Sequence, residues 1–277
     1  MCNNILQYAH VYAWAKEHHR HTVSMRFAYK YQYFHICTTP HHNILYYLAG
    51  KFLAQWGVIP TVTYEGSTAR KPENEARILA HRNVMVEGWS VRHFDLFLKY
   101  FDDIRKLFEF KPAIRRKIQK YLEETASSQH LKIGIHIRRG DYQTWCGGKY
   151  YFTDEEYLAY IRQALRQLGN DTCTLYFCSN IPLDQNLFRT ALQGYNLCFP
   201  SGNPGEDLCL LSLCDYLIGP LSSFTLVASM YGKAKLCWMH SHEPSDPLDF
   251  QPFEVRLPQL DAPWTTTDYT DFSDYTD

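Results

Sequence analysis

The sequence predicts an α/β protein whose C-terminal half forms a parallel, Rossmann-like sheet. Short apolar segments alternate with helical segments from residue 132 to residue 238, as in successive strand–helix units. Polar residues follow three of the apolar segments, where the carboxyl ends of parallel strands would share one edge. Of the 277 residues, 45% are apolar, so the chain can form one large domain or two moderate ones with a substantial core.

Composition excludes several classes of protein. A net charge of -1 argues against nucleic acid as a partner. The nine cysteines are odd in number and contain no Cys-x-x-Cys pair, which favours buried thiols in a reducing compartment over a disulfide framework. Neither a transmembrane segment nor a signal peptide is recognisable in the sequence. The expected location is the cytoplasm, and peripheral association with the inner face of the membrane stays open.

Residues 1–126 are predicted to form an N-terminal domain of helices and short strands. A helix is expected from a cap at Asn3 or Asn4 to Glu17. The cluster His18-His19-Arg20-His21 suits a solvated helix end better than a metal site. Further elements follow in order: a strand at 22–27, a helix at 44–56, strands at 59–64 and 83–89, and helical segments at 93–108 and 112–125. A polar break at 126–129 marks the expected domain boundary.

Residues 127–243 are predicted to form the Rossmann-like domain. Expected strands lie at 132–137, 174–178, 196–199, 215–218 and 235–238. Expected helices lie at 154–168, 183–192, 206–214 and 224–231. Periodicity is lost from Pro244, so residues 244–277 are taken as a C-terminal extension that ends in a frayed acidic tail.

The strand at 132–137 leads into the segment with the most informative chemistry, Arg138-Arg139-Gly140-Asp141. Two adjacent arginines are costly to leave unpaired at a strand end, and their planar groups match phosphate oxygens two at a time. A diphosphate would suit them. A structural ion pair, with Asp141 neutralising one arginine, is an equally good interpretation of these four residues.

Three other positions fall at the same predicted edge. Ser179-Asn180 ends one strand, and Ser222-Ser223 opens a helix whose N–H groups and hydroxyls suit phosphate, although an ordinary N-cap explains them equally well. Asp207 starts another helix, where it either caps the helix or accepts hydrogen bonds from a guanine base or a ribose. The sequence lacks Walker A, GxGxxG and Asp-x-Asp motifs, so the paired arginines would take the place of a metal ion on a departing diphosphate.

Several of these segments resemble the α-1,2-fucosyltransferases, glycosyltransferase family 11. His136-Ile137-Arg138-Arg139-Gly140-Asp141-Tyr142 is similar to the first family motif. Tyr176-Phe177-Cys178-Ser179-Asn180 is similar to the second, in which an aspartate commonly stands where this chain has Asn180. The stretch 206–225 resembles the third motif, and 2–9 and 84–89 resemble two further family segments. The family's strand and glycines ahead of the opening segment are missing, so the chain is expected to start late.

The resemblance implies an α/β, GT-B-like fold of two Rossmann-like domains, of which the C-terminal one binds the sugar nucleotide. It implies an inverting enzyme that moves L-fucose from GDP-fucose to a hydroxyl of a glycan acceptor, usually O2 of a galactose. The family needs no metal or other cofactor. Two alternatives stay open: another GDP-sugar transferase of GT-B-like fold, and a non-catalytic nucleotide- or glycan-binding protein.

The resemblance also implies roles for individual residues. Arg138 would bind the diphosphate and stabilise departing GDP, with His136 and Arg139 supporting or contacting it. Asp207 would hold the guanosine and Ser222 and Ser223 the phosphates, while Ser179 and Asn180 are further candidates for binding the donor. Asp141 is the first candidate for the general base, ahead of Glu87 and His240.

Overall fold

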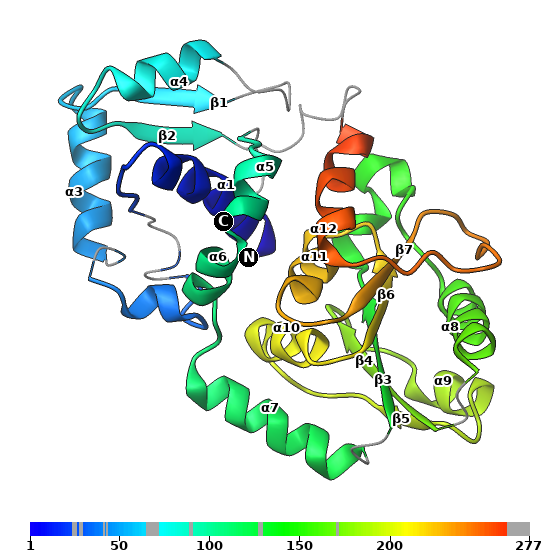
Figure 1. The fold of residues 1–277 in the computed structure, drawn as a ribbon. Helices are drawn as coiled ribbons and strands as arrows, with labels where there is room; N and C mark the ends of the chain where they lie inside the picture. Colours follow the sequence, from blue (N-terminus) through cyan, green and yellow to red (C-terminus); the bar gives the residue numbers. More distant parts are fainter. Residues whose placement is uncertain are drawn as a thin grey trace. The chain divides into compact units, whose positions relative to one another are not determined.

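The computed structural model describes residues 1–23, 27, 30–40, 42, 44–64, 72–88, 91–126, 130–169 and 172–264. The chain divides into two compact units (Figure 1). We call Met1–Lys111 the N-terminal unit and Pro112–Leu260 the C-terminal unit. The predicted α/β class with parallel sheets is confirmed, because every strand pair named below is parallel.

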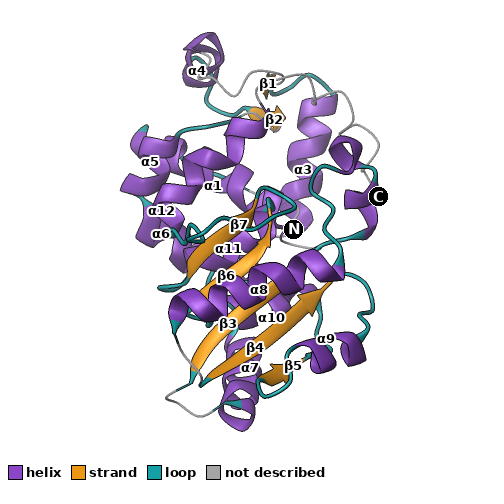
Figure 2. Cartoon of the chain, turned by 90° about the vertical axis from the view of Figure 1, so that its right-hand side faces the viewer, coloured by secondary structure: helices purple, strands orange, loops and turns teal. Residues whose placement is uncertain are grey.

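The C-terminal unit is built on a five-stranded parallel sheet (Figure 2). The strands stand in the order β5-β4-β3-β6-β7. Their bounds are β3 Leu131–Ile137, β4 Cys173–Ser179, β5 Asn196–Cys198, β6 Tyr216–Pro220 and β7 Lys235–Met239. All five were predicted within two residues at their starts and ends.

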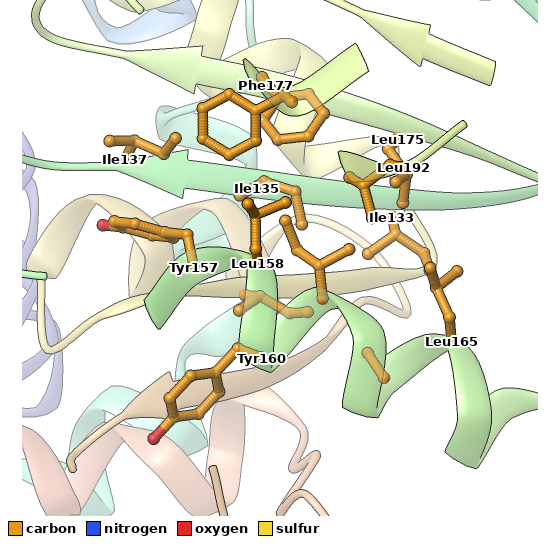
Figure 3. Packing of buried hydrophobic residues seen from close by; sticks show 14 of the residues in the cluster. Ile133, Ile135, Ile137, Tyr157, Leu158, Tyr160, Leu165, Leu175, Phe177 and Leu192 are labelled. Carbon is orange, nitrogen blue, oxygen red and sulfur yellow. The ribbon is translucent and has the colours of Figure 1, made fainter. Parts of the chain in front are cut away.

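The two faces of β3 carry different side chains, because alternate residues of a strand point to opposite sides. Ile133, Ile135 and Ile137 join the apolar cluster formed with α8 Asp154–Leu168 and α9 Gln185–Ala191 (Figure 3). Gly134 and His136 point the other way. A Cβ at Gly134 would lie 2.6 Å from a methyl of Leu211, so the glycine lets α10 Pro204–Ser212 pack closely on β3.

The strand order reverses at β3. The chain runs from β3 through α8 to β4 on one side, whereas β6 lies on the other side of β3 and is followed by α11 Ser223–Met230. Ligands of open parallel sheets bind outside the carboxyl ends of the strands at such a reversal. The fold therefore predicts a ligand site at the loops after β3 and β6.

Local sequence signals explain where these helices begin. Thr153 and Glu156 form a capping box at α8, and Asn203 and Glu206 form one at α10. Ser222 caps α11 as predicted, since its hydroxyl accepts a hydrogen bond from the N–H of Phe224 at 3.1 Å. Each cap follows a strand, so each helix starts at the edge of the sheet that carries the polar loops.

The N-terminal unit holds a two-stranded parallel sheet within the described residues. Its elements are α1 Cys2–Glu17, α3 Ile44–Gln55, β1 Thr61–Tyr64, α4 Pro72–Leu79, β2 Met85–Gly88, α5 Phe94–Lys99 and α6 Phe101–Leu107. α4 was not predicted. No helix in the described part of the chain combines the length and the apolar character needed to cross a bilayer.

Several expectations for the first half of the chain need correction. Met1, not Asn3 or Asn4, precedes α1, and it makes no side-chain cap. The segment 93–108 is two helices that meet at Tyr100, where the side chains of Lys99 and Tyr100 both donate to the Glu17 carboxylate of α1. Residues 24–26 of the predicted strand 22–27 and residues 127–129 of the polar break lie outside the described residues, and the described residues 22, 23 and 27 are not in a strand.

Helix α7 Pro112–Thr125 lies in the C-terminal unit, whereas the sequence analysis placed it in the N-terminal domain. Its Ile118 and Leu122 are buried, and Lys117 donates to Glu206 of α10 at 2.6 Å. These contacts explain why the division between the units falls after Lys111. The segment after Pro244, for which no periodicity was found, contains α12 Phe253–Arg256 and a 3-10 helix over Leu257–Trp264.

Candidate functional site

The three polar loops that follow β3, β4 and β6 meet at one edge of the sheet. The Asn180 side chain accepts from the N–H of Arg139 at 2.8 Å and donates to the Arg139 carbonyl at 2.7 Å. The Tyr142 hydroxyl donates to the carbonyl of Leu221, after β6, at 2.9 Å. These bonds fix the loop after β3 from both neighbouring strands.

Arg138 is the half-exposed arginine of this loop. Its side chain is 35% exposed, and Nη2 lies 2.6 Å from the Asp141 carboxylate. The guanidinium also stands over the ring of Tyr142, with 5.6 Å to the centroid. The predicted pairing of Asp141 with one arginine is therefore present, and Arg138 keeps a solvent-facing surface on which an anion can bind.

Arg139 is buried and points into the protein. Its Nη2 lies 2.6 Å from the carboxylate of Asp154, the first residue of α8, and its Nε donates to the Phe152 carbonyl at 3.1 Å. Rings of Tyr151 and Tyr157 flank it at 5.8 Å. These contacts hold the loop against the start of α8. Arg139 therefore stabilises the loop, whereas Arg138 is the arginine that can bind an anion.

His136 lies below the loop on the face of β3 that packs against α11. Its ring stacks on Phe224 at 4.8 Å and is buried, and its Nδ1 is a buried atom for which no described residue provides a hydrogen bond. Gly219 of β6 leaves room for it, because a Cβ there would lie 3.2 Å from the His136 Cβ. Burial, and then the charge of Arg138, lower the pKa of His136 to about 3, so the ring is neutral near pH 7.

This neutral histidine predicts a pH dependence of stability. The pKa of His136 is lower in the folded state than its ordinary value of 6.5. The unfolded chain therefore binds an extra proton between those values, and stability falls as pH falls through that window. Relative to His136→Gln, the free energy of unfolding of the wild type should drop by about 1 kcal/mol more between pH 6.5 and pH 5.5. Urea unfolding of both proteins at the two pH values measures this, and parallel pH profiles would contradict it.

The helix that follows β6 presents its N-terminus to the same edge. Ser222 is buried and caps α11, and its carbonyl accepts from the hydroxyl of Thr225 at 2.9 Å. Thr225 in turn accepts from the Trp238 indole at 3.1 Å, so the first turn of the helix is held firmly. The opening N–H groups of a helix have no partner within it, and its dipole favours an anion there.

Asp207 occupies the first turn of α10 but does not cap it. Asn203 does so, because its side chain accepts from the N–H groups of Gly205 and Glu206 at 2.9 and 3.1 Å. The Asp207 carboxylate is half-buried over Gly202, and no hydrogen bond to it is found among the described residues. Burial, and then the charge of Glu206, raise the pKa of Asp207 to about 6. A partly desolvated carboxylate without a donor is suited to accept from a ligand.

Comparison with known proteins identifies the family of the chain. The model of Glycosyl transferase family 11 matches residues 74–235, which is more than half of the chain and includes the loops after β3, β4 and β6 as well as Asp207. The chain belongs to glycosyltransferase family 11. The membership predicted from the motifs is thus confirmed.

Solved structures agree with this family 11 chain in fold at low sequence identity. A mutant of Arabidopsis thaliana FUT1 in complex with GDP is 13% identical, with a TM-score of 0.59 over 90% of this chain and 71% of that one. Fucosyltransferase NodZ from Bradyrhizobium is 15% identical, with a TM-score of 0.54 over 91% and 94%. POFUT1 in complex with GDP-fucose is 9% identical, with a TM-score of 0.52 over 85% and 94%. In another POFUT1 crystal, with GDP, the match spans 55% of that chain. A sequence search of curated proteins finds no match.

Two predicted site residues of this family 11 protein do not belong to the loops after β3, β4 and β6. Glu87 belongs to β2 of the N-terminal unit. His240 follows β7, at the end of the sheet beyond β6, and its pKa is lowered by burial and then by the charge of Arg256. Within the described ranges, no group of three or more His, Cys, Asp or Glu side chains is arranged to hold a metal ion.

The sequence analysis missed the residues that hold the motif in place. Asp154, Tyr157 and Phe224 contact Arg139, the β3 backbone and His136 respectively. Asp154 carries a signal that was available, because it directly follows the capping residue Thr153 of a predicted helix. Tyr157 and Phe224 lie 21 and 88 positions from His136, and no local pattern indicates their partner.

Proposed function

We propose that this protein transfers L-fucose from GDP-fucose to a sugar hydroxyl, by inversion and without a metal ion, with O2 of a galactose in a glycan as the acceptor position. Family 11 membership and the fold shared with GDP-bound FUT1 and GDP-fucose-bound POFUT1 support the donor. The observation that carries the proposal is the half-exposed guanidinium of Arg138 at the reversal of the strand order. In this account the C-terminal unit is the nucleotide-binding half of a GT-B-like enzyme.

The diphosphate would lie between the loop after β3 and the N-terminus of α11. Arg138 would offer its planar group from one side, while the opening N–H groups of α11 and the Ser223 hydroxyl would act from the other. Negative charge grows on the β-phosphate as GDP departs, so donors fixed in advance stabilise the transition state more than the ground state. The pair with Asp141 orients Arg138, and we assign Asp141 that role ahead of general base.

The nucleoside would extend from this point towards Asp207. Burial, and then the charge of the Asp207 carboxylate, raise the pKa of Cys178 near the end of β4, so Asp207 lies on the β4 side of the edge. β4 and β6 are separated by β3 alone, which puts their ends about 10 Å apart. That span suits the distance from a purine base to its β-phosphate. Asp207 would then accept hydrogen bonds from the guanine.

Asn180 is compatible with an active enzyme. Its side-chain amide uses both its acceptor and its donor on the backbone of Arg139. The aspartate more common in the family could accept the first bond but, when ionised, could not donate the second. The substitution thus preserves the loop that presents Arg138. This observation favours the transferase over the non-catalytic alternative.

Asp207→Asn is expected to weaken GDP binding by at least about tenfold at pH 8 and at the same time to raise the melting temperature of the free protein. Asparagine removes a desolvated charge, so the fold gains stability although the ligand loses an anionic acceptor. The wild-type affinity should also decline as pH falls through about 6, where Asp207 becomes protonated, and the variant should not share that decline. Calorimetric titration with GDP and a melting curve measure both effects. Loss of stability in Asp207→Asn would contradict the assignment.

A donor panel tests the proposed function itself. GDP-fucose and GDP should raise the melting temperature, because a ligand that binds only the folded state stabilises it. GDP-mannose should have a smaller effect and UDP-galactose none. Radiolabelled GDP-fucose with a set of galactose-terminated glycans then detects transfer, with chelator present throughout. Binding of GDP without transfer to any acceptor would favour the non-catalytic alternative, and a preference for GDP-mannose would favour another GDP-sugar transferase.

A further inference from the structure

Helix α3 of the N-terminal unit turns its apolar face outward. Leu45, Phe52 and Trp56 are 73%, 52% and 70% exposed, and their spacing of seven and four residues puts them on one side of the helix. Leu48 and Leu53, also exposed, flank this row. The least exposed positions are the three that point the opposite way, which are Tyr47, Gly50 and Ala54.

This arrangement is the reverse of the ordinary one, in which the apolar stripe of a surface helix faces the core. The helix has no fully buried residue, although it contains a single charged side chain, Lys51. Exposed Val58 extends the apolar surface beyond its C-terminus. Contiguous apolar surface of this kind marks an interaction site. We call Leu45, Leu48, Phe52, Leu53, Trp56 and Val58 the α3 patch.

The sequence on either side of α3 is basic in character. No Asp or Glu occurs between Glu17 and Glu65. The same stretch contains four Lys or Arg residues and six His residues, listed here as Arg20, Arg26, Lys30, Lys51, His18, His19, His21, His35, His41 and His42. The segment that carries the apolar patch is therefore cationic and suits an anionic surface.

We propose that the α3 patch docks this protein on a membrane surface that contains anionic phospholipids. Leucine, phenylalanine and tryptophan on one face, with a lysine at its border, are the composition of a helix that lies in the interfacial plane. With 12 residues, α3 is about 18 Å long and too short to cross the hydrocarbon core. A second copy of the chain is a poorer occupant, because the contact would bring two cationic segments together.

Sedimentation with vesicles tests the proposal. Wild-type protein should sediment with vesicles of phosphatidylcholine and phosphatidylglycerol, and much less with phosphatidylcholine alone. The double variant Phe52→Ser/Trp56→Ser should lose at least about tenfold in partition coefficient, and Lys51→Glu should lose part of the preference for anionic lipid. Leu98→Ser, a change at an exposed leucine of α5, is the matched control and should bind as the wild type does.

Melting curves and GDP binding should be unchanged in all these variants, so this test is independent of the proposed function. Equal binding of wild type and double variant, or no preference for anionic vesicles, would overturn the proposal. So would a dimeric mass in light scattering that becomes monomeric in the double variant, because a second copy would then be the occupant of the patch.

Discussion

Replacing Arg138 with alanine is expected to lower fucose transfer by about a thousandfold or more while the melting temperature stays nearly constant. The guanidinium is half-exposed, and its ion pair with Asp141 spans three residues of one loop, so the fold depends little on it. Its proposed partner is the diphosphate, on which charge develops as the glycosidic bond breaks. Removing it should therefore reduce kcat more than it weakens GDP-fucose binding.

Two further variants make this result specific. Arg138→Lys keeps the charge but loses the planar pair of donors, so it should recover only part of the activity. Arg162→Ala changes an exposed arginine of α8 that donates to a backbone carbonyl at 3.2 Å, and it should retain full activity. Turnover in Arg138→Ala equal to the wild type would refute the assigned role.

Replacing the next residue, Arg139, with alanine is expected to act on the fold. The change leaves Asp154 without its partner and empties a buried position bordered by Phe152, Tyr151 and Tyr157. Breaking one side of a buried ion pair costs about 3–5 kcal/mol, which lowers the melting temperature by about 10 °C. Activity should fall in proportion to the loss of folded protein.

A double-mutant cycle with Asp154→Ala tests whether Arg139 stabilises the fold through its ion pair with Asp154. The double variant Arg139→Ala/Asp154→Ala should be less destabilised than the sum of the single changes, because the second removes the charge that the first leaves unpaired. Arg139→Ala that melts like the wild type but no longer binds GDP would reverse our assignment. Arg139 would then contact the nucleotide directly.

Much of the C-terminal unit could be predicted because its signals are local. Short stretches of sequence are enough to predict β3, a seven-residue strand rich in isoleucine. The same holds for α8, which begins with the Thr153–Glu156 capping box. The N-terminal unit was harder to predict. Tyr100, where two helices meet, donates to Glu17, 83 residues earlier, and the apolar α3 gives no sign in its sequence that its stripe faces outward.

The candidate site divides in the same way. Parallel topology was enough to bring Arg138, Asn180 and Ser222 to one edge, because it depends only on where strands end. The sequence did not predict that Arg138 is half-exposed whereas Arg139 is buried. Adjacent residues at a strand end leave in opposite directions, and only the position of Asp154 and the ring of Tyr142 determines which one is buried. Likewise, Asp207 can be told from a helix cap only because Asn203 already caps α10.

A crystal structure with GDP tests the central claim most directly. We predict the β-phosphate within hydrogen-bond distance of the Arg138 guanidinium and of the opening N–H groups of α11, with the guanine against Asp207. A pyrophosphate bound away from this edge, or held there by a cation in place of Arg138, would contradict the account.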